Sequence, residues 1–261
     1  VLHGAKRDNI LGRHIMQYSL GIDIGSVSAK LALIDGNSSV VALDAERITS
    51  GPRDAFNALL CRLATKVDPE DVVTAGSSGC GNVVIPEEFN WSEYSSSLTV
   101  ASGVLHRYPD AKTIVSVGGQ SSLVIGLEDG LRKPWRVASN PLCAAGTGRF
   151  LDQQAYRIGI TLDDFARLAL SYDGTAPRIA ARCSVFAKSD LIHLQQKGVP
   201  VEAMLWGLSG SIARMVVSLT KGVFEEPVYF VGGVAANGAI LKSLSEAFSE
   251  RNGYRVSPII P

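Results

Sequence analysis

Two strand–turn–strand units with glycine at the bend constrain the fold of this chain most. The first is GIDIGSVSAKLALI, residues 21–34, in which alternating apolar residues flank a tight turn. The second runs through TIVSV, GGQSS and LVIGL, residues 113–127. Glycine lets backbone amides approach a phosphate without a side chain in between, and several such amides form an anion site. The repeated layout predicts two related lobes, each offering a hairpin to a central cleft.

The rest of the chain alternates predicted strands and helices, the pattern of an α/β fold. Residues 72–82 favour a strand that runs into a glycine-rich turn, and residues 227–248 favour a strand, a glycine turn and a helix. The first 15 residues show no period, so we expect an extension or a linker there. Helical patterns cover 54–67, 92–108, 145–158, 161–171, 179–197 and 200–221.

Charge and hydropathy argue against several classes of partner. Basic and acidic residues both number 25, so the formal net charge is zero and no global field attracts nucleic acid or an anionic membrane. No apolar run reaches the roughly 18 residues that span a bilayer. The four cysteines lack disulfide-type spacing. We therefore expect a soluble protein of the reducing cytoplasm that binds a small molecule or a protein, with no nucleic-acid or membrane partner.

The first hairpin carries side chains suited to a nucleotide phosphate. Asp23 can hold a magnesium ion through water. The bend at Gly25 is followed by three side chains that can touch phosphate, Ser26, Ser28 and Lys30. The alternative is an ordinary hairpin in which Asp23 caps its own turn.

Three further glycine turns follow in the chain. A glycine-rich helix start, as in GTG, fits a phosphate site, and the turn GGVAANG lets a base or ribose lie against backbone. Four such turns in this order are more specific than any one of them. The residues concerned are Gly118 and Gly119 in the second hairpin, Gly146, Thr147 and Gly148 in GTG, and Gly232 and Gly233 in the last turn.

Cys143 and Cys183 each open a helical segment and lie 40 positions apart, so neither belongs to a CxxC pair. A four-iron cluster normally takes four cysteine ligands. Two chains that place these cysteines about a twofold axis would complete the set, which predicts a homodimer with one shared [4Fe-4S] cluster. The alternative is that both are buried structural cysteines. We expect Cys61 to be a small buried hydrophobe and Cys80 to be a fortuitous thiol.

The order of the turns resembles the nucleotide-binding fold shared by actin, heat-shock chaperones and sugar kinases. The motifs CAAGTGRFLD and CSVFAKSD narrow the resemblance to the BadF/BadG/BcrA/BcrD-type ATPase family, from about Tyr18 to Pro261. That family activates 2-hydroxyacyl-CoA dehydratases and benzoyl-CoA reductase. The resemblance implies an α/β, actin-like ATPase domain over residues 16–261, with a central nucleotide cleft and two lobes of about 16–115 and 116–261.

The resemblance also implies the chemistry. ATP hydrolysis with Mg²⁺ drives a low-potential electron from a [4Fe-4S] cluster, shared by the homodimer, to an iron-sulfur acceptor enzyme, with ferredoxin or flavodoxin as the donor. Cys143 and Cys183 would be the cluster ligands. Asp23 and the turn from Gly25 to Lys30 would form the first phosphate site, and Gly232 and Gly233 the nucleoside site for ATP or ADP.

Three departures from the family pattern matter. The second hairpin has Ser116 and Ser121 where the family has aspartates, so Ser116 and Gln120 stand at the catalytic position and we expect slow hydrolysis. Lys188 stands where the family often has an acid, which changes the charge near the cluster. The sequence stops before the final helix of the family, so we expect the natural polypeptide to continue.

Two alternatives stay open. A small-molecule kinase of the same fold would have both cysteines merely buried and would need a catalytic aspartate in the cleft. A nucleotide-binding module that no longer hydrolyses ATP could regulate a larger activator.

Overall fold

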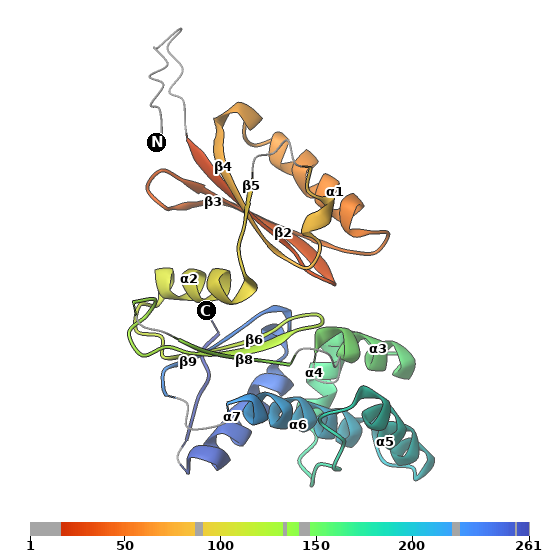
Figure 1. Ribbon diagram of the computed structural model, residues 1–261. Coiled ribbons are helices and arrows are strands. Elements are labelled where there is room, and N and C mark those ends of the chain that lie inside the picture. The colour runs from red at the N-terminus through yellow and green to blue at the C-terminus, as the bar shows by residue number, and fades with distance from the viewer. Residues whose placement is uncertain are drawn as a thin grey trace, which may run out of the picture. The chain divides into compact units, whose positions relative to one another are not determined.

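The computed structural model describes residues 17–86, 91–132, 135–140, 147–220, 225–253 and 255–260 of the 261-residue chain. The chain forms two compact units, Val1–Tyr94 and Ser95–Pro261 (Figure 1). The boundary estimated from the sequence, near residue 115, lies within the second unit. The reason is that helix α2 (Ser96–Arg107) buries Ala101 and Val104 in the same cluster as Ile114 of that unit.

The first unit is a five-stranded sheet in the order β3-β2-β1-β4-β5. Strands β1, β2 and β3 are antiparallel neighbours, whereas β4 runs parallel to β1 and β5 parallel to β4. Helix α1 begins with Pro52, whose fixed φ suits the first helical turn. The elements are β1 (Tyr18–Ile24), β2 (Ser28–Asp35), β3 (Val40–Arg47), α1 (Pro52–Ala64), η1 (Pro69–Asp71), β4 (Val72–Gly79), η2 (Asn82–Val84) and β5 (Trp91–Glu93).

Helix α1 covers one face of the first sheet. Its buried Phe56 and Leu59 join a cluster with alternate residues of β1, including Ile22 and Ile24. Because side chains alternate across a strand, Asp23 points to the opposite face. The core of this unit therefore fixes which face of β1 carries the carboxylate.

The second unit is a four-stranded sheet in the order β8-β7-β6-β9, with α2 on one face and α6 and α7 on the other (Figure 1). Ile114 of β6 packs toward α2, while Val115 and Val117 join the larger core with α6 and α7. The elements are α2, β6 (Thr113–Val117), β7 (Ser122–Gly126), β8 (Arg136–Ser139), α3 (Gly148–Ile158), α4 (Leu162–Ser171), α5 (Ser184–Gln196), α6 (Val201–Leu219), β9 (Val228–Val231), η4 (Gly233–Ala236) and α7 (Gly238–Asn252).

Several sequence-based boundaries were wrong. Ser92 and Glu93, expected at the start of a helix, belong to strand β5 beside β4. Helix α2 begins only after Ser95, whose hydroxyl caps the helix by accepting from Leu98 N at 3.3 Å. The helix expected from residue 179 begins at Ser184. Cys61 is exposed rather than buried. It lies two positions after the buried Leu59, which turns it about 200° to the far side of α1.

Over the part of the chain that the structure describes, no helix combines the length and the apolar character needed to cross a membrane.

Candidate functional site

The first hairpin closes through its glycine. Gly25 N–H donates to the carbonyl oxygen of Ser28 at 3.0 Å, so residues 25–28 form a compact turn between β1 and β2. Asp23 and Lys30 lie opposite each other in the antiparallel register, and Lys30 Nζ donates to Asp23 Oδ2 at 2.8 Å. Both side chains are nearly half exposed. An exposed ion pair of this kind stabilises a protein by about 1 kcal/mol at most, so either partner is available to a ligand.

The end of β4 packs against this hairpin. Gly79 has φ +106°, and a β-carbon there would overlap the backbone oxygen of Ile24 and lie 3.0 Å from Asp23 Oδ1. Gly81 N–H donates to the same Ile24 oxygen at 3.0 Å. Cys80 is exposed between these glycines. The sequence predicts a glycine-rich turn here but not its contact with Asp23. That contact depends on the parallel pairing of β1 and β4, which no local pattern shows.

The second hairpin repeats the closure. Gly118 N–H donates to Ser121 O at 2.8 Å, and Gln120 is exposed at the tip of the turn. Ser116 is half-buried in β6, in register with Leu123 of β7. The position that corresponds to the Asp23–Lys30 pair thus holds a hydroxyl and an aliphatic side chain.

The start of helix α3 holds the second hairpin in place. The N–H groups of Gly148 and Arg149 donate to Gly118 O and Gly119 O, each at 2.9 Å. The preceding residue, Thr147, is fully buried. We expected these first-turn amides to face a phosphate, and in this structure they bind the hairpin carbonyls. Gly146 lies outside the described residues.

The turn after β9 meets the same hairpin. Gly232 has φ +92°, and a β-carbon there would overlap the backbone oxygen of Val117, the last residue of β6. Gly233 is exposed and begins η4. Gly118, Gly148 and Gly232 are therefore brought together at the carboxyl ends of the parallel strands β6 and β9. This is the edge of an open α/β sheet where ligands usually bind.

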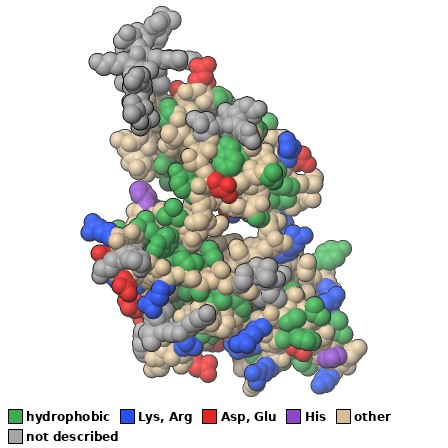
Figure 2. All heavy atoms as spheres, viewed as in Figure 1, with side chains coloured by type: hydrophobic (Ala, Val, Ile, Leu, Met, Phe, Trp, Pro, Cys, Tyr) green, Lys and Arg blue, Asp and Glu red, His purple; other side chains and the backbone are tan. Residues whose placement is uncertain are grey.

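Cys183 occupies the N-cap position of α5. Its backbone is extended, its side chain makes no capping hydrogen bond, and the residue is half-buried. Cysteine sulfur is the usual protein ligand of an iron-sulfur cluster. Val185 and Phe186 in the next turn are about two-thirds exposed. Hydrophobic and basic side chains appear together on the surface in the region of α5 (Figure 2).

These properties of Cys183 fit a cluster ligand. Cys143, the other expected ligand, lies outside the described residues. Within the described ranges, no group of three or more His, Cys, Asp or Glu residues could hold a metal ion.

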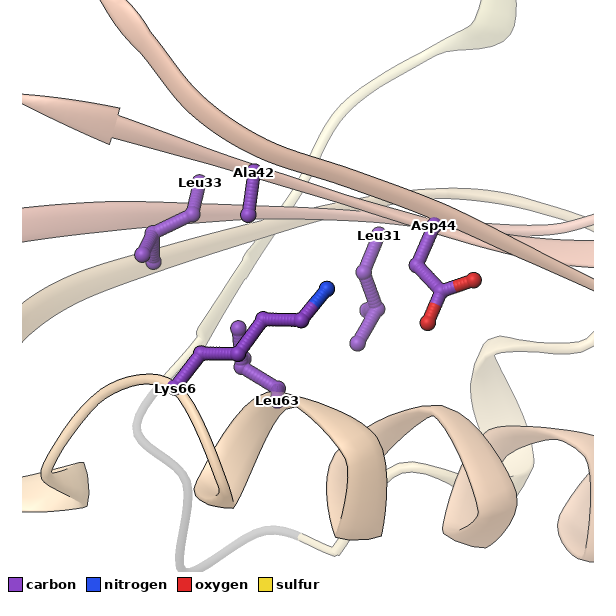
Figure 3. A pocket seen from close by; sticks show the side chains of 6 residues that line it. All are labelled: Leu31, Leu33, Ala42, Asp44, Leu63 and Lys66. Carbon is purple, nitrogen blue, oxygen red and sulfur yellow. The ribbon is translucent and has the colours of Figure 1, made fainter.

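A small hollow lies under α1, away from these turns (Figure 3). Its volume of about 10 Å³ is close to the minimum for one water molecule. Leu31, Leu33, Ala42 and Leu63 line it, with Asp44 and Lys66 beside them. It is too small to be a nucleotide site.

Comparison with known proteins decides the family. Residues 20–260 match the sequence model of the BadF/BadG/BcrA/BcrD ATPase family. The chain belongs to this family. The resemblance inferred from the glycine turns and cysteine motifs is thus confirmed.

Two curated proteins named as activators are similar to most of this chain. The activator of lactoyl-CoA dehydratase from Anaerotignum propionicum is 32% identical, covering 87% of each chain. The (R)-2-hydroxyglutaryl-CoA dehydratase activating ATPase from Acidaminococcus fermentans is 30% identical, covering 88% of this chain and 87% of its own.

A solved structure gives the same result for the family fold. The activator of 2-hydroxyisocaproyl-CoA dehydratase from Clostridium difficile, with bound ADPNP, superposes with a TM-score of 0.80. It is 28% identical, and the match covers 94% of this chain and 88% of that one. A ROK family glucokinase from Streptomyces griseus shares the fold at 12% identity, with a TM-score of 0.53. The expected α/β, actin-like, two-lobed ATPase fold is confirmed.

Proposed function

We propose that this chain is an ATP-dependent reductive activator. It would hydrolyse ATP and pass a low-potential electron to an iron-sulfur partner enzyme such as a 2-hydroxyacyl-CoA dehydratase. The observation that carries the proposal is the convergence of Gly118, Gly148 and Gly232 at one sheet edge, in a chain whose relatives are named activators of such enzymes. An edge of this kind, lined by backbone rather than side chains, suits a nucleotide.

The nucleotide roles follow from the two hairpins. In the first unit, Asp23 would hold Mg²⁺ through water, and Lys30 would exchange its bond to Asp23 for a phosphate oxygen. The turn residues Gly25, Ser26 and Ser28 would contact phosphate. In the second unit, Gly118 and Gly119 would contact phosphate, and Gly232 and Gly233 the nucleoside.

Hydrolysis requires a water molecule to attack the γ-phosphorus while the bond to the ADP oxygen breaks. Gln120 is exposed at the turn and would orient that water, as glutamine does in other nucleotide hydrolases. Ser116 can hydrogen-bond but cannot take the proton at neutral pH. This chain would therefore hydrolyse ATP slowly.

The electron-transfer part rests on Cys183 and Cys143. In a homodimer these residues would supply four thiolates. A [4Fe-4S] cluster held there would supply a one-electron carrier, accepting from ferredoxin or flavodoxin and giving to the partner enzyme. The exposed Val185 and Phe186 beside Cys183 would be covered by the second copy. Such chemistry belongs in the reducing cytoplasm.

A second candidate, a nucleotide-binding module without hydrolysis, is favoured by one observation. The second hairpin has no carboxylate at Ser116 or at its register partner Leu123. The rate of ATP turnover separates the two candidates. A small-molecule kinase is less well supported, because it needs a catalytic aspartate.

Anaerobic reconstitution with iron and sulfide tests the proposal. We expect broad visible absorption, a dimer in native mass spectrometry, and magnesium-dependent phosphate release. A monomer that takes up no iron would refute the proposal of a reductive activator. An iron-loaded dimer that never releases phosphate would favour the nucleotide-binding module without hydrolysis.

A further inference from the structure

The segment that leads into Cys183 is irregular but firmly attached. Residues 172–183 contain no helix or strand. Buried backbone groups need hydrogen-bond partners, and an irregular segment must find them elsewhere. The side chain of Ile179 is 1% exposed, so this part of the segment is anchored in the core of the second unit.

Two charged side chains from two different helices hold this segment. Asp190 of α5 accepts a hydrogen bond from Ala180 N at 2.8 Å. Arg214 of α6 donates through Nη2 to Ile179 O at 2.9 Å. Consecutive residues are thus held on opposite sides of one peptide unit, the N–H by an anion and the carbonyl by a cation. Hydrogen bonds to ionised groups are stronger than neutral ones.

The two contacts lie close to Cys183 in the chain. Three peptide links join Ala180 to Cys183, and they reach about 10 Å at most. Asp190 lies seven residues after Cys183, which places both on the same face of α5 about 10 Å apart along its axis. The bond from Asp190 to Ala180 therefore ties α5 to the segment that delivers its own N-cap residue. Fixing Ala180 therefore limits Cys183 to positions within about 10 Å of the tied peptide.

Arg214 keeps its positive charge although its side chain is partly buried beside Ile179 O. Partial burial lowers the pKa of its guanidinium, and Arg178 acts in the same direction, while Glu250 opposes them. Arginine stays protonated at any physiological pH. The bond to Ile179 O is therefore charge-assisted under all working conditions.

We propose that Asp190 and Arg214 are positioning residues for Cys183, holding the peptide between Ile179 and Ala180 so that the thiol stands at the N-terminus of α5 in the geometry a cluster ligand needs. This inference rests on the proposed function, because it assigns a purpose to the position of that thiol. Neither residue touches the cluster; each acts through the backbone. Outer residues that orient a metal ligand typically change metal affinity by about 10- to 100-fold.

The test compares Asp190→Ala with Asp190→Asn, whose amide oxygen can still accept from Ala180 N. Thr161→Ala is the matched control, because Thr161 Oγ1 accepts from Asp164 N at 3.0 Å at the start of another helix of the same unit. All three are studied first without metal. We expect Asp190→Ala to speed hydrogen exchange at the Ala180 amide by about 10- to 100-fold, the effect of losing a hydrogen bond to a charged group. Alkylation of the Cys183 thiol should also be faster in Asp190→Ala than in wild type. Both rates should stay close to those of wild type in Asp190→Asn and Thr161→Ala.

The second readout is the rate at which reconstituted protein loses iron to a chelator. Asp190→Ala should lose iron about 10- to 100-fold faster than wild type, and Asp190→Asn should restore retention. If Asp190→Ala does not fold, Arg214→Met should show the same direction of change. Equal iron loss in Asp190→Ala and Thr161→Ala, or unchanged exchange and alkylation in Asp190→Ala, would overturn the inference. A wild type that binds no iron would refute the proposed function, while exchange and alkylation still decide whether Asp190 positions Cys183.

Discussion

The hairpin of the first unit and the hairpin of the second close in the same way. In each, the glycine N–H donates to the carbonyl three residues on, from Gly25 to Ser28 and from Gly118 to Ser121. In each, a glycine of positive φ packs on the hairpin from the neighbouring parallel strand: Gly79, the last residue of β4, on Ile24, and Gly232, directly after β9, on Val117. The same backbone arrangement, a glycine-closed hairpin with a second glycine packed on it, thus occurs once in each unit.

The side chains on the two hairpins differ. The residue two positions before the hairpin glycine is Asp23 in the first unit and Ser116 in the second, and the register partners are Lys30 and Leu123. The backbone is therefore specified by glycines, and the chemistry by the residues that flank them. We therefore expect phosphate binding to persist at the second hairpin, although it has no carboxylate at this position.

The largest effect should come from replacing the two equivalent glycines that pack on the hairpins, Gly79 in the first unit and Gly232 in the second. Gly79→Ala and Gly232→Ala each place a β-carbon on a neighbouring backbone oxygen in a strained conformation. We expect each to lower the free energy of unfolding by roughly 3 kcal/mol. Gly36→Ala is the control, because a β-carbon there meets nothing within 4 Å. Denaturant unfolding measures the free energy of unfolding of all three variants. A small decrease for either Gly79→Ala or Gly232→Ala would show that the two turns are not structurally equivalent.

The next effect concerns the carboxylate that differs between the hairpins. Ser116→Asp gives the second hairpin the acid that the first one has, so it should raise magnesium-dependent ATP hydrolysis at least several-fold, up to about 10²-fold. ATP affinity should change much less, because backbone amides dominate binding. Gln120→Ala should lower the remaining activity. Equal rates for wild type and Ser116→Asp at saturating ATP would show that hydrolysis does not depend on a carboxylate here.

The smallest effect concerns Lys30. Lys30→Met removes an exposed ion pair, so stability should change by about 1 kcal/mol or less. Arg167→Met removes a matched exposed pair, also 2.8 Å long, with Asp164 in α4. Calorimetry should show weaker ATP binding for Lys30→Met alone. If both variants bind ATP like wild type, Lys30 has no role at the phosphate.

The sequence predicted the hairpins well, because glycine between alternating apolar runs is a local signal. It missed β3, since Val40, Val41 and Leu43 on this edge strand are exposed and the run lacks a buried alternation. It also missed the contacts of Gly79 with Ile24 and of Asp190 with Ala180. Both join residues that only the tertiary fold brings together, so no local pattern reveals them. The expectation that Cys183 opens a helix is confirmed by its N-cap position on α5, although the helical pattern taken to begin at residue 179 begins at Ser184.

The central claim is that Cys183 is a ligand of a cluster shared by two copies of the chain. Iron analysis of anaerobically reconstituted Cys183→Ala beside wild type tests it most directly, with ADP binding measured on the same samples. We predict about four irons per wild-type dimer and none in the variant, since the substitution removes two of four thiolates. ADP binding should survive, because the glycine turns do not include Cys183. A variant that keeps the wild-type iron content would contradict the claim.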